Sequence, residues 1–149
     1  MEFQLSDFKH NLDIQVRFND VDGFRHVNNS IMHEYFDLGR MSYLIKLLNF
    51  NYKLVDDENL VIVSTKTDFI KPVHLDDKLK VYSKVYQIGD KSLKMIQWLV
   101  KEGDEDASVT CLSTLAGFIP SKESSMEIPD KWILALKEYE NDSLEIRKK

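Results

Sequence analysis

The sequence predicts an α+β fold in which one long helix is covered by an antiparallel sheet. An alternating apolar and polar segment, Leu12 to Asn19, is followed from Asn29 by apolar residues at three- and four-residue steps. Four segments with strand character come next, separated by turn-forming residues. A helix with so broad an apolar stripe needs a sheet to bury it, and a curved antiparallel sheet can do so.

The first strand and the helix are distinguished by their periods. Successive side chains of a strand point to opposite faces, so one face would carry Leu12, Ile14, Val16 and Phe18. In "SIMHEYFDLGRMSYLIKLL" the apolar residues follow the spacing of a helix instead. We therefore expect a half-buried strand over 12–19 and a long helix that begins at Asn29.

The four later strands are predicted over 59–72, 77–88, 91–101 and 107–119. The first is rich in β-branched residues and is closed by Pro72. The "GDK" between the second and third indicates a hairpin. After Pro129, "DKWILALKEYE" is typical of a short amphipathic helix, and we expect the last nine residues to fray.

Composition and charge limit the functional classes. The 149 residues are 43% hydrophobic and 30% charged, which is ordinary for one globular domain spanning 1–149. The net charge of −5 disfavours a nucleic-acid or membrane-surface binder. The one cysteine excludes an internal disulfide. The apolar runs are too short to span a membrane and the N-terminus has no secretory pattern, so we expect a cytoplasmic protein.

The segment "RFNDVDGFRHVNN", residues 17–29, joins the predicted strand to the predicted helix. It contains two carboxylates, a glycine, a histidine and two asparagines. One interpretation is an Asx turn at Asp22 followed by an asparagine helix cap. The other is an active site at a strand-to-helix corner, where the first N–H groups of the helix lack internal partners. Both interpretations are compatible with the residues.

This corner resembles that of the 4-hydroxybenzoyl-CoA thioesterase family, whose members have the hotdog fold. The family's pattern is Arg-Phe, Asp-x-Asp, a short loop, and often Gly-His-Val-Asn-Asn at the start of the helix. The residues that fall on it are Asp20, Asp22, His26, Val27, Asn28 and Asn29. "FIKPVHLDDKLKV" and "GFIPSKESSMEIPDKW" are also similar to the family, so the resemblance covers roughly Ile14 to Leu136. It implies one long central helix wrapped by a curved five-stranded antiparallel sheet, with a short C-terminal helix.

The resemblance implies which residues form the site. Asp22 falls at the family's catalytic aspartate, as nucleophile or general base, and the backbone N–H of Asn29 falls at its oxyanion donor. His26 matches a histidine that is catalytic in similar plant acyl-carrier-protein thioesterases. The residues expected to contact substrate are Gly23, Phe24, Arg25, Val27, Asn28, Met32, and, from the neighbouring subunit, Ser64 and Thr65.

The sequence departs from the family at several of these positions. Arg25 replaces the usual glycine, so we expect Gly23 to supply the flexibility of the loop. Met32 replaces a common aromatic residue, so the family's acyl-pocket shape does not carry over directly to this sequence. Phe24 stands where the plant enzymes carry an asparagine, so their full set of catalytic residues is absent here. In an alternative interpretation, His26 is therefore not catalytic and forms a hydrogen bond that orders the loop.

Other polar residues have simpler interpretations. Asp20 would face the same side as Asp22 in a continuing strand. The two charges would then raise the pKa of one carboxyl group. In the simpler interpretation, Asp20 accepts hydrogen bonds from loop amides. Glu34 and Asp37 lie one helical turn apart, as on a solvated face. Cys111 is typical of a buried thiol. Three further histidines have no evident partners or metal-ligand spacing, namely His10, His33 and His74.

The leading functional hypothesis is an acyl-CoA thioesterase that releases a free acid and coenzyme A. No metal or cofactor is expected, because the coenzyme A moiety belongs to the substrate. The alternatives are an acyl-carrier-protein thioesterase and a hotdog protein that binds acyl-CoA without turning it over. The resemblance also implies a homodimer or homotetramer, in which the strand over 59–69 meets its own copy. The acyl chain would pass Met32 and Phe36.

Overall fold

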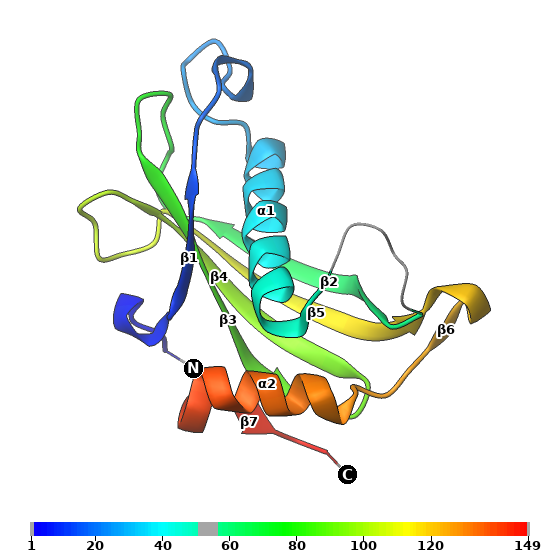
Figure 1. The fold of residues 1–149 in the computed structure, drawn as a ribbon. Helices are drawn as coiled ribbons and strands as arrows, with labels where there is room; N and C mark the ends of the chain where they lie inside the picture. Colours follow the sequence, from blue (N-terminus) through cyan, green and yellow to red (C-terminus); the bar gives the residue numbers. More distant parts are fainter. Residues whose placement is uncertain (1, 51–56, 149) are drawn as a thin grey trace. The chain divides into compact units, whose positions relative to one another are not determined.

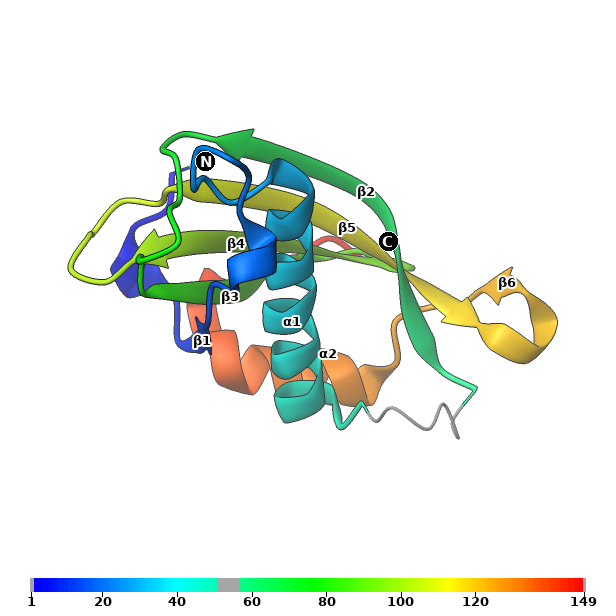
Figure 2. The same cartoon turned by 90° about the horizontal axis from the view of Figure 1, so that it is seen from above.

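The computed structural model describes residues 2–50 and 57–148 (Figure 1). Its main elements are β1 (His10–Ile14), α1 (Asn29–Leu48), β2 (Asn59–Phe69), β3 (Leu79–Ile88), β4 (Ser92–Lys101), β5 (Val109–Ile119) and α2 (Asp130–Glu140). The strand order is β1-β3-β4-β5-β2, with β2 at an edge beside β5 (Figure 2). The predicted α+β class, with one long helix, one short helix and a five-stranded antiparallel sheet, is confirmed.

Two very short strands extend this sheet. β6 (Ser124–Ser125) pairs antiparallel with β5, and β7 (Glu145–Ile146) pairs parallel with β3. The N–H of Arg147 also donates to the carbonyl of Ile88 at 2.8 Å. The prediction that the tail frays is therefore wrong for residues 145–147, whose backbone finds partners on the sheet.

The described chain divides into two compact units. The first comprises Met1–Tyr43, Thr67–Lys84 and Gln97–Cys111, and the second comprises Leu44–Lys66, Val85–Ile96 and Leu112–Lys149. Residues 1, 51–56 and 149 lie outside the described residues, so the single domain over 1–149 stays a prediction. No helix in the described part of the chain is long and apolar enough to cross a membrane.

In the first unit, α1 packs closely on the strands. Its buried face and the strands form one cluster, whose members are Ile14, Val27, Met32, Tyr35, Phe36, Val73, Leu79, Val81, Leu99, Val109 and Cys111. A Cβ at Gly39 would collide with the side chain of Val81, so glycine permits this approach. The buried amide of Gln97 donates to the carbonyl of Phe36 at 2.9 Å, which ties α1 to β4. The start of α1 is thereby held in place.

The second unit has its own buried residues. They include Leu48, Ile88, Leu93, Met95, Leu115, Ile128, Trp132 and Leu136. The ring centroids of Phe50 and Trp132 lie 5.4 Å apart, which packs the segment after α1 against α2. The amphipathic helix predicted after Pro129 is thus confirmed, with Trp132 and Leu136 on its buried face.

Candidate active site

The corner before α1 is a compact loop rather than a continuation of β1. β1 ends at Ile14, and residues 18–20 form a single turn of 3₁₀-helix. The N–H of Asp20 donates to the carbonyl of Arg17, while the carboxylate of Asp20 accepts the N–H of Arg17. These bonds satisfy the backbone without a neighbouring strand. The strand predicted over 12–19 is therefore wrong beyond Ile14.

Asp20 is the buried centre of this corner. Only 1% of it is exposed, and its carboxylate accepts the hydroxyl of Tyr35 at 2.6 Å and pairs with Arg17 at 2.9 Å. Burial alone would raise the pKa of Asp20, but the hydrogen bonds from Tyr35 and Arg17 outweigh it and lower that pKa. The pKa of Tyr35 is raised, by burial and by this same bond.

The main chain of Asp20 also ties the corner to the helix, because its carbonyl accepts the N–H of Asn28 at 3.0 Å. With its side chain pointed at Tyr35, Asp20 does not share a face with Asp22. The expectation from a continuing strand is thus corrected, and Asp20 is a structural carboxylate that bonds the loop.

Asp22 lies in the exposed part of the loop. Its Oδ1 accepts the N–H of Phe24 at 2.9 Å and the N–H of His26 at 3.1 Å. These bonds form the Asx turn that the sequence suggested. Among the described residues, no donor reaches the other oxygen, Oδ2. The turn therefore fixes the direction of the carboxylate and leaves one oxygen open to a ligand.

Arg25 takes the unusual backbone conformation in this loop, with a φ of 63°. That left-handed conformation costs other residues more than glycine, because their Cβ crowds the backbone. The flexibility expected of Gly23 is not used, since Gly23 is not among the residues with positive φ in the described part of the chain. The family's usual glycine suits this position because glycine adopts a positive φ without strain. In this protein an arginine adopts the same conformation.

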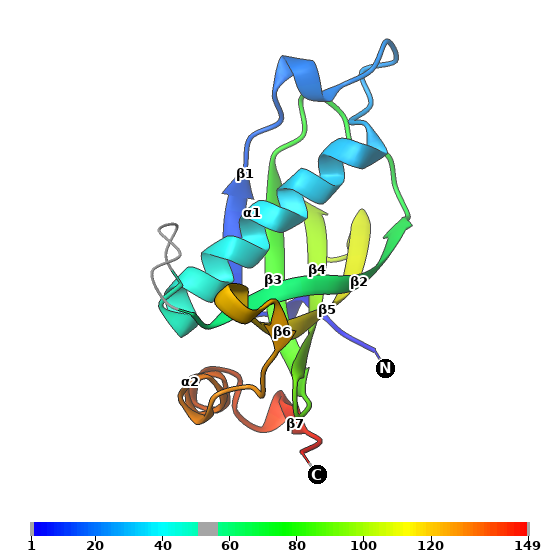
Figure 3. The ribbon, with the colours of Figure 1, turned by 90° about the vertical axis from the view of Figure 1, so that its right-hand side faces the viewer.

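α1 begins at Asn29, as predicted, directly after the loop that follows β1 (Figure 3). The carbonyl of Asn28 accepts the N–H groups of Ile31 and Met32 at 3.0 and 3.3 Å, so Asn28 is the cap residue. Within the described residues, the N–H groups of Asn29 and Ser30 have no acceptor. They lie at the positive end of the helix dipole, which favours a negatively charged oxygen.

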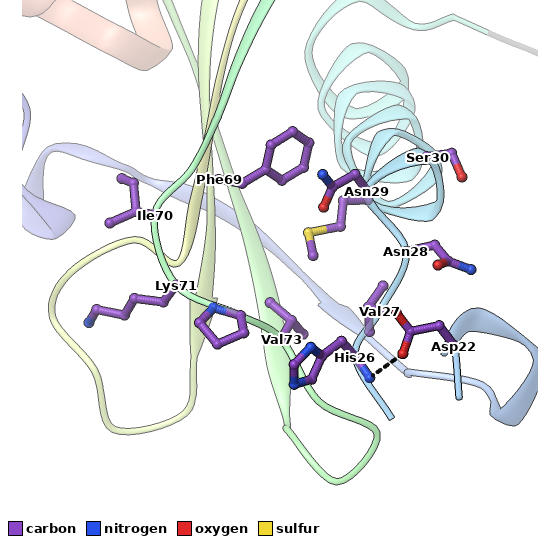
Figure 4. Close-up of a pocket in the computed structure, with 12 residues that line it drawn as sticks. Asp22, His26, Val27, Asn28, Asn29, Ser30, Phe69, Ile70, Lys71 and Val73 are labelled. Carbon is purple, nitrogen blue, oxygen red and sulfur yellow. Dashed lines mark hydrogen bonds between the residues drawn. The ribbon is translucent and has the colours of Figure 1, made fainter. Parts of the chain in front are cut away.

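The helix start and the Asp22 loop border one cavity of about 590 Å³ (Figure 4). One wall comes from the loop and the first turn of α1, and the other from the segment after β2. The lining residues are Asp22, His26, Val27, Asn28, Asn29, Ser30, Met32, Phe69, Ile70, Lys71, Pro72 and Val73. The structure thus brings together six residues predicted at the site, namely Asp22, His26, Val27, Asn28, Asn29 and Met32.

The opposite wall, residues 69–73, is fixed by backbone bonds. The N–H groups of Ile70 and Lys71 both donate to the carbonyl of Ser108 at 2.9 Å, and the N–H of Val27 donates to the carbonyl of Val73 at 2.7 Å. The side chain of Lys71 extends away from Asp22 and lies 3.8 Å from Asp104 (Figure 4). Folding alone places this segment, with Lys71, beside the helix start.

Other predicted residues lie elsewhere. Gly23, Phe24 and Arg25 are exposed in the loop and do not line the cavity, and Phe24 is 82% exposed. Ser64 and Thr65 are exposed on β2 and are likewise not lining residues. Their assignment to substrate stays a prediction.

The residues with simpler interpretations also have defined places. The expected path past Phe36 stays a prediction, since Phe36 is packed in the core, is 1% exposed and is not a lining residue of the cavity. Glu34 pairs with Arg17 and Asp37 with Arg40, both in partly exposed ion pairs. Cys111 is buried as predicted, and burial raises the pKa of its thiol.

The histidines judged to be without partners have them. The ring of His74 lies 4.8 Å from that of His26 and its Nδ1 is 3.6 Å from Asp77. His33 contacts the ring of Phe69, and Nε2 of His10 lies 3.2 Å from the hydroxyl of Ser42. No group of three or more metal-ligating side chains is found within residues 2–50 and 57–148.

Solved structures of other proteins share this architecture. The PA5185 protein of Pseudomonas aeruginosa is 22% identical, with a TM-score of 0.82 over 91% of this chain and 94% of that one. A thioesterase from Thermus thermophilus, solved with coenzyme A and Zn, is 21% identical, with a TM-score of 0.78 over 90% and 96%. The likeness confirms the predicted hotdog fold.

The sequence itself establishes the family. Residues 16–136 match the thioesterase-like superfamily, and the chain belongs to it. The uncharacterized protein YsmA of Bacillus subtilis (strain 168) is 31% identical over 83 residues, which are 55% of this chain. That match spans about half the length of the relative, 54%.

Proposed function

We propose that this protein hydrolyses acyl-CoA thioesters at the cavity beside the start of α1. One observation carries the proposal: the open oxygen of Asp22 and the unpaired N–H of Asn29 belong to residues that line the same cavity. Membership of the thioesterase-like superfamily supports the reaction class. The coenzyme A in the Thermus thermophilus thioesterase supports the choice of carrier.

The two groups have complementary roles in thioester chemistry. As water adds to the thioester carbon, the carbonyl oxygen gains negative charge, which the N–H of Asn29 and the helix dipole stabilise. The carboxylate of Asp22 takes the proton of that water, or attacks the carbon itself to form an anhydride that water then opens. The C–S bond breaks, and coenzyme A leaves as a thiolate that takes up a proton. His26 borders the same space and would supply that proton; because Asp22 and His26 are both exposed, exchange with solvent would then remove the proton from Asp22 and restore the one lost by His26.

The acyl group would lie against the apolar wall. Val27, Met32 and Val73 are buried residues that border the cavity, and Phe69 borders it from the same wall as Val73. Because Phe36 is packed in the core, the acyl group would not run along the helix to Phe36 but would follow a shorter path that ends at Met32. It favours short or planar acyl groups within one chain.

A second copy of the chain would extend this path. β2 is an edge strand of 11 residues with exposed apolar side chains, among them Ile62 and Val63. Exposed edges of this kind favour pairing with another strand. We expect two β2 strands to pair, which would bring Ser64 and Thr65 of the partner subunit to the acyl group. Light scattering at micromolar concentration tests this, and an active monomer would contradict it.

The phosphates of coenzyme A would lie at the rim, where Lys71 is the lining residue with a positive charge. We expect Lys71→Ala to raise KM for acyl-CoA about fivefold, the effect of losing about 1 kcal/mol from an exposed ion pair. KM for an acyl-pantetheine, which lacks those phosphates, should not change. Lys66→Ala on β2 is the matched control, since Lys66 does not line the cavity.

The activity is tested by thiol release from a panel of acyl-CoA and acyl-carrier-protein thioesters of varied chain length and aromatic character. We expect turnover of acyl-CoA, fastest with short or aromatic acyl groups. Faster turnover of the carrier-protein esters would move the assignment to that substrate class. Tight binding of acyl-CoA without thiol release would identify a binding protein and overturn hydrolysis.

A further inference from the structure

One histidine of the cavity wall, His26, is paired with a second histidine, His74, from a distant segment of the chain. Residues 25–27 and 73–75 run antiparallel, joined by the N–H of Val27 to the carbonyl of Val73 at 2.7 Å and the N–H of Leu75 to the carbonyl of Arg25 at 3.3 Å. His26 and His74 are the residues opposite each other between these two bonds. In antiparallel pairs, such a position brings the side chains closest together.

The two imidazoles meet edge to face. Their centroids are 4.8 Å apart and their planes are inclined by 76°. This is the arrangement that aromatic rings prefer, with the edge of one on the face of the other. His26 would otherwise have little to hold it, because neighbouring Phe24 and Arg25 are exposed.

His74 is held in turn by Asp77. One carboxylate oxygen of Asp77 accepts the backbone N–H of His74 at 2.7 Å and lies 3.6 Å from Nδ1 of the ring. The N–H of Asp77 donates back to the carbonyl of His74 at 3.1 Å, which closes the turn. The same carboxylate oxygen is 3.5 Å from the ammonium of Lys101. Asp77 is therefore anchored to β4 as well as to the turn.

We propose that His74, held by Asp77, is a positioning residue that keeps the imidazole of His26 directed at the cavity. The inference rests on the proposed hydrolysis, in which His26 protonates the departing sulfur. His74 acts through His26 and does not touch the substrate, since it is not a lining residue. A misplacement of about 1 Å at a reacting group can lower a rate by about 10²-fold, so a loosened His26 has a measurable cost.

The kinetic test compares four proteins with the wild type: His74→Ala, His74→Phe, His26→Ala, and the double variant of His26 and His74 to alanine. We expect His74→Ala to lower kcat about tenfold with KM within twofold. His74→Phe should restore most of the rate, because its ring preserves the edge-to-face contact. In the His26→Ala background, His74→Ala should have no further effect, since it acts only through His26.

Asp77→Ala and Asp76→Ala are the second comparison. Asp77→Ala should lower kcat in the same direction as His74→Ala, whereas Asp76→Ala should not, because Asp76 is an exposed neighbour in the same turn. Nuclear Overhauser contacts between the two histidine rings provide a readout besides activity. They should be present in the wild type and in Asp76→Ala, and weakened in Asp77→Ala.

The possible outcomes distinguish the positioning role of His74 from the proposed thioester hydrolysis. If the wild type and His26→Ala differ in kcat but folded His74→Ala matches the wild type, the positioning role is wrong and hydrolysis stands. Equal losses in the His74→Ala and His74→Phe proteins, or additive losses in the double variant, would also overturn it. If the wild type releases no thiol from any ester, the proposed function fails and the positioning role fails with it.

Discussion

Asp20 and Asp22 are two residues apart in one loop, but their carboxylates have opposite surroundings. Asp20 is buried and accepts hydrogen bonds from Tyr35 and Arg17. Asp22 is exposed, and its Oδ1 accepts two loop N–H groups. A carboxylate saturated by the protein can do little for a ligand, whereas one with an open oxygen can act on it. The contrast shows that Asp20 builds the corner, and it supports our proposal that Asp22 performs the chemistry.

The largest expected effect on stability is that of Asp20→Ala. It leaves the hydroxyl of Tyr35 and the charge of Arg17 without their buried partner, so we expect a loss of about 3 kcal/mol in the free energy of unfolding. Chemical denaturation measures it. Asp13→Ala is the control, because Asp13 is exposed and forms a surface ion pair with Lys80, and it should cost under about 1 kcal/mol. Equal losses in the two variants would contradict the role of Asp20.

The pH dependence of unfolding sharpens the same contrast. The pKa of Asp20 is lower in the folded protein than its ordinary value of about 3.9, so its contribution is fully present above that value. The contribution is lost as pH falls through the lowered pKa. We expect wild type to lose more stability than Asp20→Asn between pH 6 and pH 3. Parallel curves for the two proteins would show that the charge of Asp20 adds nothing.

The smallest expected effect is at Arg25. Arg25→Gly should raise the free energy of unfolding by up to about 1 kcal/mol, because glycine adopts a φ of 63° without the Cβ penalty. Arg25→Ala removes the same charge but keeps the Cβ, so it should give no such gain. If both variants change stability equally, the side chain of Arg25 matters and its backbone conformation does not.

The sequence predicted the elements of this fold well because period and turn residues are local signals. The alternation before Ile14 and the helical spacing from Asn29 both appear in the structure. The predicted first strand was too long at its C-terminal end. Apolar and polar residues still alternate after Ile14, but the turn closed by Arg17 and Asp20 takes the chain out of the sheet. A hydrogen bond within the loop decided that boundary.

The candidate site was predicted only where its residues are contiguous. Asp22, His26 and Asn29 lie in one segment and border one cavity, as their pattern indicated. The wall formed by residues 69–73 and the contact of His26 with His74 join segments about 50 residues apart. No local sequence pattern indicates a contact between segments so far apart. The sequence singled out His74 only as part of the family-like segment "FIKPVHLDDKLKV" and as a histidine without an evident partner.

The most direct test of the account is to measure kcat for thioester hydrolysis in Asp22→Asn and Asp20→Asn, together with their free energies of unfolding. We predict that Asp22→Asn lowers kcat by about 10²-fold or more and changes the free energy of unfolding little, because the amide keeps the Asx turn but is neither base nor nucleophile. Asp20→Asn should chiefly lose stability. Near-wild-type turnover in a folded Asp22→Asn protein would contradict the assignment of Asp22 as the reacting carboxylate.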